Sequence, residues 1–64
     1  MRLTEFWRRM NKAFGAEYAE SVARDQVLRE LGGRSVDQAL KDGADAKDVW
    51  RAVVDHFQLP ARER

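Results

Sequence analysis

The chain has 64 residues, of which 12 are basic and 11 acidic, so its formal net charge is +1. This balance excludes a general electrostatic attraction to nucleic acid or to an anionic membrane. The lack of cysteine excludes disulfides and thiolate metal ligands. A domain of this size buries only about 60% of the surface that its unfolded chain exposes, so its stability must come from packed apolar helix faces.

Residues 5–14 form the first predicted helix, and Thr4 is its expected N-cap. Apolar residues recur at three- and four-residue intervals, which is typical of the buried stripe of an amphipathic helix, and Phe6 widens this stripe. The stripe consists of Leu3, Trp7, Met10 and Phe14. Gly15 breaks or sharply bends the chain after this helix.

The opposite face of the first helix carries a local basic patch, which Glu5 shares. The basic residues are Arg2, Arg8, Arg9 and Lys12. Three or four phosphate contacts from such a patch would give weak, salt-sensitive binding to nucleic acid. The alternative is a solvated face with no ligand.

Residues 16–31 are helical by composition, but their apolar positions do not form one stripe, and Leu28 points away from the others. One interpretation is a break near Arg24 and Asp25, with Asp25 capping a second short helix. The other is one continuous helix that is contacted from several sides. Periodicity leaves both open.

Turn and cap signals are dense between residues 31 and 50. Gly32 and Gly33 predict a helix end, because glycine adopts the left-handed conformation without a Cβ penalty. Ser35 and Gln38 have the spacing of a capping box, which predicts a third helix from Val36 to about Asp42. Gly43 ends that helix.

The fourth helix is predicted from Ala46 to about Phe57, with Asp45 as N-cap. It has the cleanest apolar face, consisting of Ala46, Trp50, Val53, Val54 and Phe57. Pro60 disfavours helix at the preceding residue, and residues 61–64 form an expected frayed tail. No segment is predicted to be a strand.

These elements predict an all-α fold, a small compact single domain of four or five short helices over residues 1–60. The apolar run lengths are far below the ~18 residues of a membrane span, and the N-terminus lacks the apolar segment of a signal peptide. We therefore expect a cytoplasmic protein with no membrane partner. The predicted core is Phe6, Trp7, Met10, Phe14, Val22, Val27, Leu31, Leu40, Val49, Trp50, Val53 and Phe57.

The residues do not favour catalysis. There is one histidine and no glycine-rich phosphate loop. His56 lies beside Asp55 without a nucleophile that it would activate, and we expect it to pack at the edge of the fourth helix. Asp42, Asp45 and Asp48 lack the alternating spacing of a calcium loop. We predict no enzyme activity, catalytic residue, cofactor, metal or small-molecule substrate.

A helix-turn-helix over residues 35–57 is one hypothesis for DNA recognition. Ala39 and Gly43 would fall where the motif needs a small residue and a turn glycine. Asp45 and Asp48 would however face phosphates, and Trp50 would have to leave the core. A helical corner without DNA binding explains the same turn residues.

Aromatic residues on the first two helices give the main functional hypothesis. Phe6, Trp7 and Tyr18 would form a surface for a protein partner or for a second copy of the chain, if four helices do not bury them all. The main prediction is therefore a non-enzymatic interaction module, binding through the face shared by these helices. The alternative is a weak nucleic-acid-binding accessory protein that uses the basic patch.

The segments MRLTEFWRRM, SVARDQVLRELGGRSVDQAL and KDVWRAV, in this order, resemble domain-of-unknown-function family 3046, short proteins of actinobacteria. The resemblance extends from Met1 to about Pro60. It implies a bacterial cytosolic domain of unassigned role, and it assigns no residue to a site.

Overall fold

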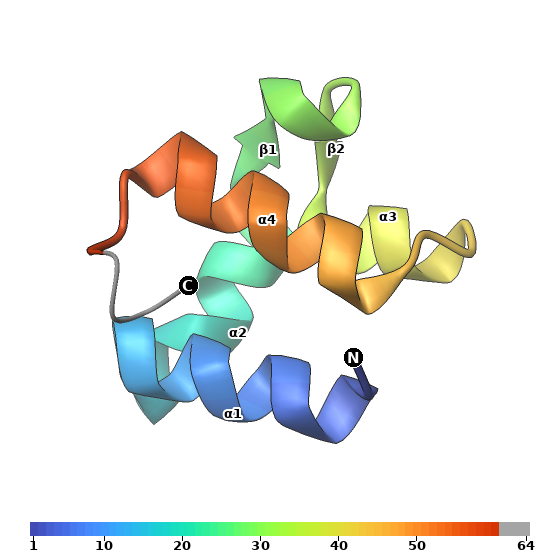
Figure 1. Ribbon diagram of the computed structural model, residues 1–64. Helices are drawn as coiled ribbons and strands as arrows, with labels where there is room; N and C mark the ends of the chain where they lie inside the picture. Colours follow the sequence, from blue (N-terminus) through green and yellow to red (C-terminus); the bar gives the residue numbers. More distant parts are fainter. Residues whose placement is uncertain (61–64) are drawn as a thin grey trace.

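Four α-helices pack together with a two-stranded hairpin at one end of the molecule in the computed structural model, which describes residues 1–60. The elements in chain order are α1 (Leu3–Phe14), α2 (Ala16–Asp25), β1 (Val27–Leu28), the 3-10 helix η1 (Arg29–Leu31), β2 (Arg34–Ser35), α3 (Val36–Lys41) and α4 (Ala46–Phe57) (Figure 1). The expectation of a small, mostly α-helical domain is confirmed. The predicted frayed tail, residues 61–64, lies outside the described residues.

Helix α1 begins earlier than the sequence suggested. Its N-cap is Arg2, which makes no side-chain capping hydrogen bond, so the prediction of Thr4 as N-cap was wrong. Gly15 separates α1 from α2 with a φ of 88°, a value that favours glycine. This sharp junction folds α2 back onto α1, the most extensive helix packing in the described chain.

Residues 16–31 are broken rather than one helix. Helix α2 ends at Asp25, which therefore does not cap a second helix. Strand β1 pairs antiparallel with β2, with Val27 opposite Ser35 and Leu28 opposite Arg34, so the prediction of no strand was wrong. Side chains alternate across a strand, and this alternation buries Leu28 completely and leaves Val27 59% exposed.

Glycines close the turn between these strands. Gly32 ends η1 in the left-handed conformation with a φ of 71°, and Gly33 follows with a φ of 81°. Two consecutive residues with positive φ are strained for residues that carry a Cβ. The predicted stop at these glycines is therefore confirmed, although the element that ends there is η1.

Local caps define the corner between α3 and α4. The Ser35 hydroxyl accepts a hydrogen bond from the Gln38 amide at 3.1 Å, as predicted. The Gln38 side chain donates to Asp42 at 2.9 Å, so its interaction differs from that of a capping box. The Asp45 carboxylate accepts from the Lys47 amide at 3.0 Å, and α4 spans the predicted residues.

Helix α4 supplies the largest share of the core, six of the fourteen buried apolar residues in the described chain, and lies across the front of the molecule in Figure 1, with α1 below it. Phe6 is fully buried, and its ring contacts Trp50 edge-on at 6.0 Å between centroids. Phe14 and Phe57 form a similar pair at 5.1 Å. The prediction of Val27 as a core residue was wrong, and the buried Leu28 and Val36 were missing from the predicted core.

Candidate interaction surface

The predicted partner face on α1 and α2 is smaller than expected. Phe6 has no exposed surface, because Trp50 of α4 and the neighbouring Trp7 both pack against its ring. Its assignment to a partner surface was therefore wrong. Trp7 is partly buried against the core. Tyr18, which is 67% exposed, is the one predicted member of this face that lies fully at the surface.

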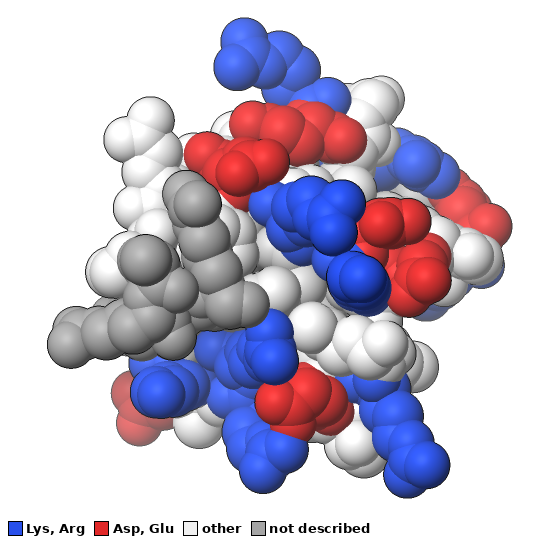
Figure 2. Space-filling view, viewed as in Figure 1, with Lys and Arg blue, Asp and Glu red and all other residues white. Residues whose placement is uncertain are grey.

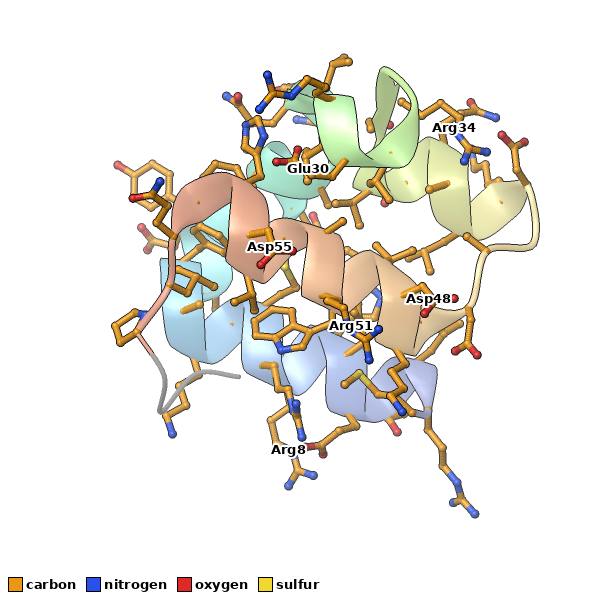
Figure 3. The ribbon with its side chains drawn as sticks, turned by 45° about the horizontal axis from the view of Figure 1, so that its top comes forward. Arg8, Glu30, Arg34, Asp48, Arg51 and Asp55 are labelled. Atoms are coloured by element: carbon orange, nitrogen blue, oxygen red, sulfur yellow. The ribbon has the colours of Figure 1, made fainter. Side chains whose placement is uncertain are left out.

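The predicted basic patch on α1 is partly neutralised by its own helix. Arg8 forms an ion pair with Glu5, and the Arg9 Nε donates to the other oxygen of the same carboxylate at 3.2 Å. These hydrogen bonds, first that of Arg8 and then that of Arg9, lower the pKa of Glu5. Arg2 and Lys12 are exposed. Figure 3 shows Arg8 projecting from α1 into solvent.

A pocket of about 470 Å³ lies between the beginning of α1 and the outer side of α4. Three apolar and four charged residues line it: Met1, Trp50 and Val54, and Arg9, Lys47, Arg51 and Asp55. Figure 2 shows uncharged surface between the charged groups over α4 and those over α1. We call this feature the α1/α4 pocket.

Two cations of the α1/α4 pocket are available to a ligand. Among the described residues, neither Lys47 nor Arg51 lies within 4.0 Å of a carboxylate. Arg51 projects from α4 between Asp48 and Asp55 (Figure 3). Exposed charges on neighbouring helical turns interact weakly in water, so these side chains can reorient towards a ligand at little cost.

Trp50, one of the residues that line the pocket, carries a buried donor. Trp50 is 3% exposed, and its Nε1 has no hydrogen-bond partner among the described residues. A buried donor without a partner costs roughly 1–3 kcal/mol. An acceptor that entered the pocket and reached this group would remove that cost.

The α1/α4 pocket was not predicted from the sequence, although part of its signal is present in the chain. Lys47, Arg51 and Asp55 recur at four-residue intervals, directly beside the apolar pair Trp50 and Val54. Residues four apart lie on the same helix face. The contribution of α1 depends on tertiary packing and has no such local signal.

His56 contacts neighbouring residues at the end of α4. Its Nδ1 lies 2.9 Å from the Glu30 Oε1, which joins the end of α4 to η1. The pKa of Glu30 is lowered, mainly by a hydrogen bond from its own backbone and then by His56. The His56 ring also contacts Phe57 edge-on at 4.8 Å between centroids. The described contacts of this histidine are therefore with Glu30 and Phe57, whereas the sequence led us to expect packing against Val49 or the tail.

Arg34 and Asp42 connect the hairpin to the end of α3. The Arg34 side chain donates to the Leu31 carbonyl at 2.8 Å and to Asp42 at 3.0 Å. Hydrogen bonds from Arg34 and then Gln38 lower the pKa of Asp42. Figure 3 places Arg34 at the end of the molecule away from Arg8. Asp42 thus has a structural role in this corner.

Helices α3 and α4 follow each other along the chain across a short turn, as the two helices of a helix-turn-helix do. The outer side of α4 carries two basic and two acidic residues within residues 47–55, however, and Trp50 remains in the core. A phosphate backbone would meet alternating charges on this helix. The geometry of this corner is therefore explained without DNA.

No group of three or more His, Asp or Glu side chains within residues 1–60 is arranged to hold a metal ion. None of the helices in the described part of the chain has the length and apolar character needed to cross a membrane.

Comparison with known proteins gives one match. Residues 1–62 match the family described as protein of unknown function DUF3046. No curated protein and no solved structure matches the chain. Because the match covers almost the whole sequence, the chain belongs to the DUF3046 family of proteins of unknown function.

Proposed function

We propose that this protein is a non-enzymatic interaction module that binds another protein through the α1/α4 pocket. The observation that carries the proposal is the combination of an apolar floor with two cations, Lys47 and Arg51, that have no ion pair in the described chain. Apolar anchors surrounded by charged groups are typical of protein interfaces.

The pocket replaces the α1/α2 face as the proposed binding surface. Burial of Phe6 leaves that face with Tyr18 as its exposed aromatic residue, and a single exposed apolar residue is normal for a monomer. The contact of the His56 Nδ1 with the Glu30 carboxylate also supports a role without catalysis, since this ring nitrogen already has a partner.

Site-specific photo-crosslinking in cells tests the proposal. A photoreactive phenylalanine analogue replaces Asp55, which lines the pocket and leaves both cations in place, Tyr18 on α2, or Arg24 as an exposed control far along α2. We expect a discrete adduct with another protein from position 55 alone. This adduct should disappear when Arg51→Glu reverses the charge of the pocket.

Other adduct patterns would contradict the proposal. An adduct from position 18 but not from position 55 would support the α1/α2 face as the binding surface instead. An adduct of twice the chain's mass would indicate a second copy of this protein instead of a different partner. When the photoreactive residue replaces Arg8, a nuclease-sensitive adduct would support the nucleic-acid alternative, in which Arg2, Arg9 and Lys12 also contact the nucleic acid.

A further inference from the structure

We propose that the α1/α4 pocket recognises an acidic segment of its partner, in which a side-chain carboxylate stands next to an apolar residue. This inference rests on the proposed function and specifies the chemistry of the partner. Three features of the pocket carry it: its apolar floor, its available cations and its buried indole donor.

The apolar floor fits a side chain rather than a bare ion. Met1, Trp50 and Val54 line the pocket, and Met1 is 40% exposed. Its volume of about 470 Å³ lies within the range of roughly 300–1,000 Å³ that is typical of ligand sites. Trp50 and Val54 are each only 3% exposed, so an apolar residue of a peptide would remove mainly the Met1 side chain from water.

The available cations provide the charge complementarity. Lys47 and Arg51 are four residues apart on α4, so their like charges occupy one helix face and repel each other. A carboxylate between them would relieve this repulsion, and arginine can bind it through two parallel hydrogen bonds. Arg9 contributes less, because it already donates to Glu5 at 3.2 Å.

The indole donor selects for an acceptor at the floor. Trp50 Nε1 is buried and has no partner among the described residues. A carboxylate offers two acceptor oxygens, so a ligand carboxylate that reached the indole Nε1 would keep a second oxygen for a cation. An apolar ligand alone would leave this donor without a partner.

Acidic groups beside the pocket favour a peptide over a nucleic acid. Asp55 lines the pocket, and Asp48 projects from α4 on the other side of Arg51 (Figure 3). A continuous phosphate backbone would pass close to both carboxylates and be repelled. A single carboxylate can bind at Lys47 and Arg51 and avoid them.

An NMR titration of the purified ¹⁵N-labelled chain tests the inference without its partner. The probe is an acetylated and amidated hexapeptide of alternating leucine and glutamate. The chain has two tryptophans, and Trp7→Phe assigns their indole signals. We expect the Trp50 indole signal to shift while that of Trp7 stays, and a peptide with glutamine in place of glutamate to bind at least tenfold more weakly.

Two variants that each remove one arginine charge test whether the acidic peptide binds at the α1/α4 pocket. Arg51→Gln should weaken binding of the acidic peptide about tenfold, whereas Arg24→Gln, which removes the same charge from α2, should leave it unchanged. Equal binding of the glutamine peptide, or equal weakening by both variants, would overturn the inference. A short DNA duplex that shifted the Trp50 indole more than the peptide does would also overturn it.

The inference and the proposed function fail in different ways. A pocket-specific protein adduct in cells, combined with no response to the acidic peptide, would refute the acidic chemistry and leave the interaction module intact. Absence of the adduct, with the peptide still shifting the Trp50 indole, would refute the proposed protein partner while the chemistry of the pocket stood.

Discussion

The outer faces of α1 and α4 both carry cations, but two arginines of α1 are held by a carboxylate of their own helix, whereas Lys47 and Arg51 of α4 are not. On α1, Arg8 and Arg9 share the carboxylate of Glu5. On α4, Lys47 and Arg51 lie beside an apolar pocket and have no ion pair within the described residues. The difference shows that binding capacity depends on the partners of each charge rather than on local charge counts.

The largest expected effect comes from the floor of the pocket, because Trp50 belongs to both the pocket and the core. Trp50→Ala removes the ring that packs on Phe6 and should destabilise the fold by roughly 3–5 kcal/mol. Since small domains are marginally stable, thermal unfolding followed by circular dichroism should show little folded protein.

A matched substitution on the other face provides the control. Arg8→Ala truncates a side chain that is 77% exposed, so the unfolding midpoint should hardly change. Trp50→Phe should restore folding while lacking the indole donor. A Trp50→Ala variant as stable as the parent would show that the pocket is separate from the core.

Side-chain capping also differs between α1 and α4, and we expect loss of a cap to have an intermediate effect on stability. The amide of Lys47 donates to Asp45 at the start of α4, whereas α1 has no side-chain cap. Asp45→Ala should therefore cost about 1 kcal/mol, measured by urea denaturation. Thr4→Ala should have a much smaller effect, and a loss equal to that of Asp45→Ala would mean that Thr4 caps α1 in solution.

The difference between local caps and contacts across the chain explains which parts of the fold could be predicted from the sequence. The caps at Ser35 and Asp45 act within three residues, so local spacing in the sequence was enough to predict them. The pairing of β1 with β2 connects Val27 to Ser35 across a turn. Two-residue strands have too little periodicity to be recognised before the pairing is known.

The predicted site failed for a related reason. Phe6 lies on the expected apolar side of α1, but its complete burial depends on Trp50, 44 positions later in the chain. The α1/α4 pocket depends on the same docking of α1 against α4. The charged and apolar residues on α4 could be recognised from their local spacing in the sequence. The opposing wall of the pocket, which Met1 and Arg9 form, could not.

Removing the Glu5 carboxylate, which Arg8 and Arg9 share, would make the outer face of α1 more like the outer face of α4. Glu5→Gln leaves Arg8 and Arg9 without this partner, so binding to a short DNA duplex should increase several-fold at low salt and fall steeply as salt rises. Fluorescence anisotropy measures both. Glu20→Gln makes the same charge change on α2, and an equal gain from it would attribute the effect to net charge.

The smallest expected effect concerns the far end of α4, where Glu30 contacts His56 at 2.9 Å. The pKa of Glu30 is lowered from 4.5 in the fold, so its ionised form contributes stability above pH 4.5, which is lost as the pH falls through the folded-state pKa. Glu30→Gln should therefore lower the melting temperature slightly near pH 6, and the difference from the parent should shrink well below pH 4.5. Differential scanning calorimetry across this range, with Glu17→Gln as the control, measures it. A difference that stayed constant with pH would indicate that packing of the Glu30 side chain, rather than its charge, holds η1 against the end of α4.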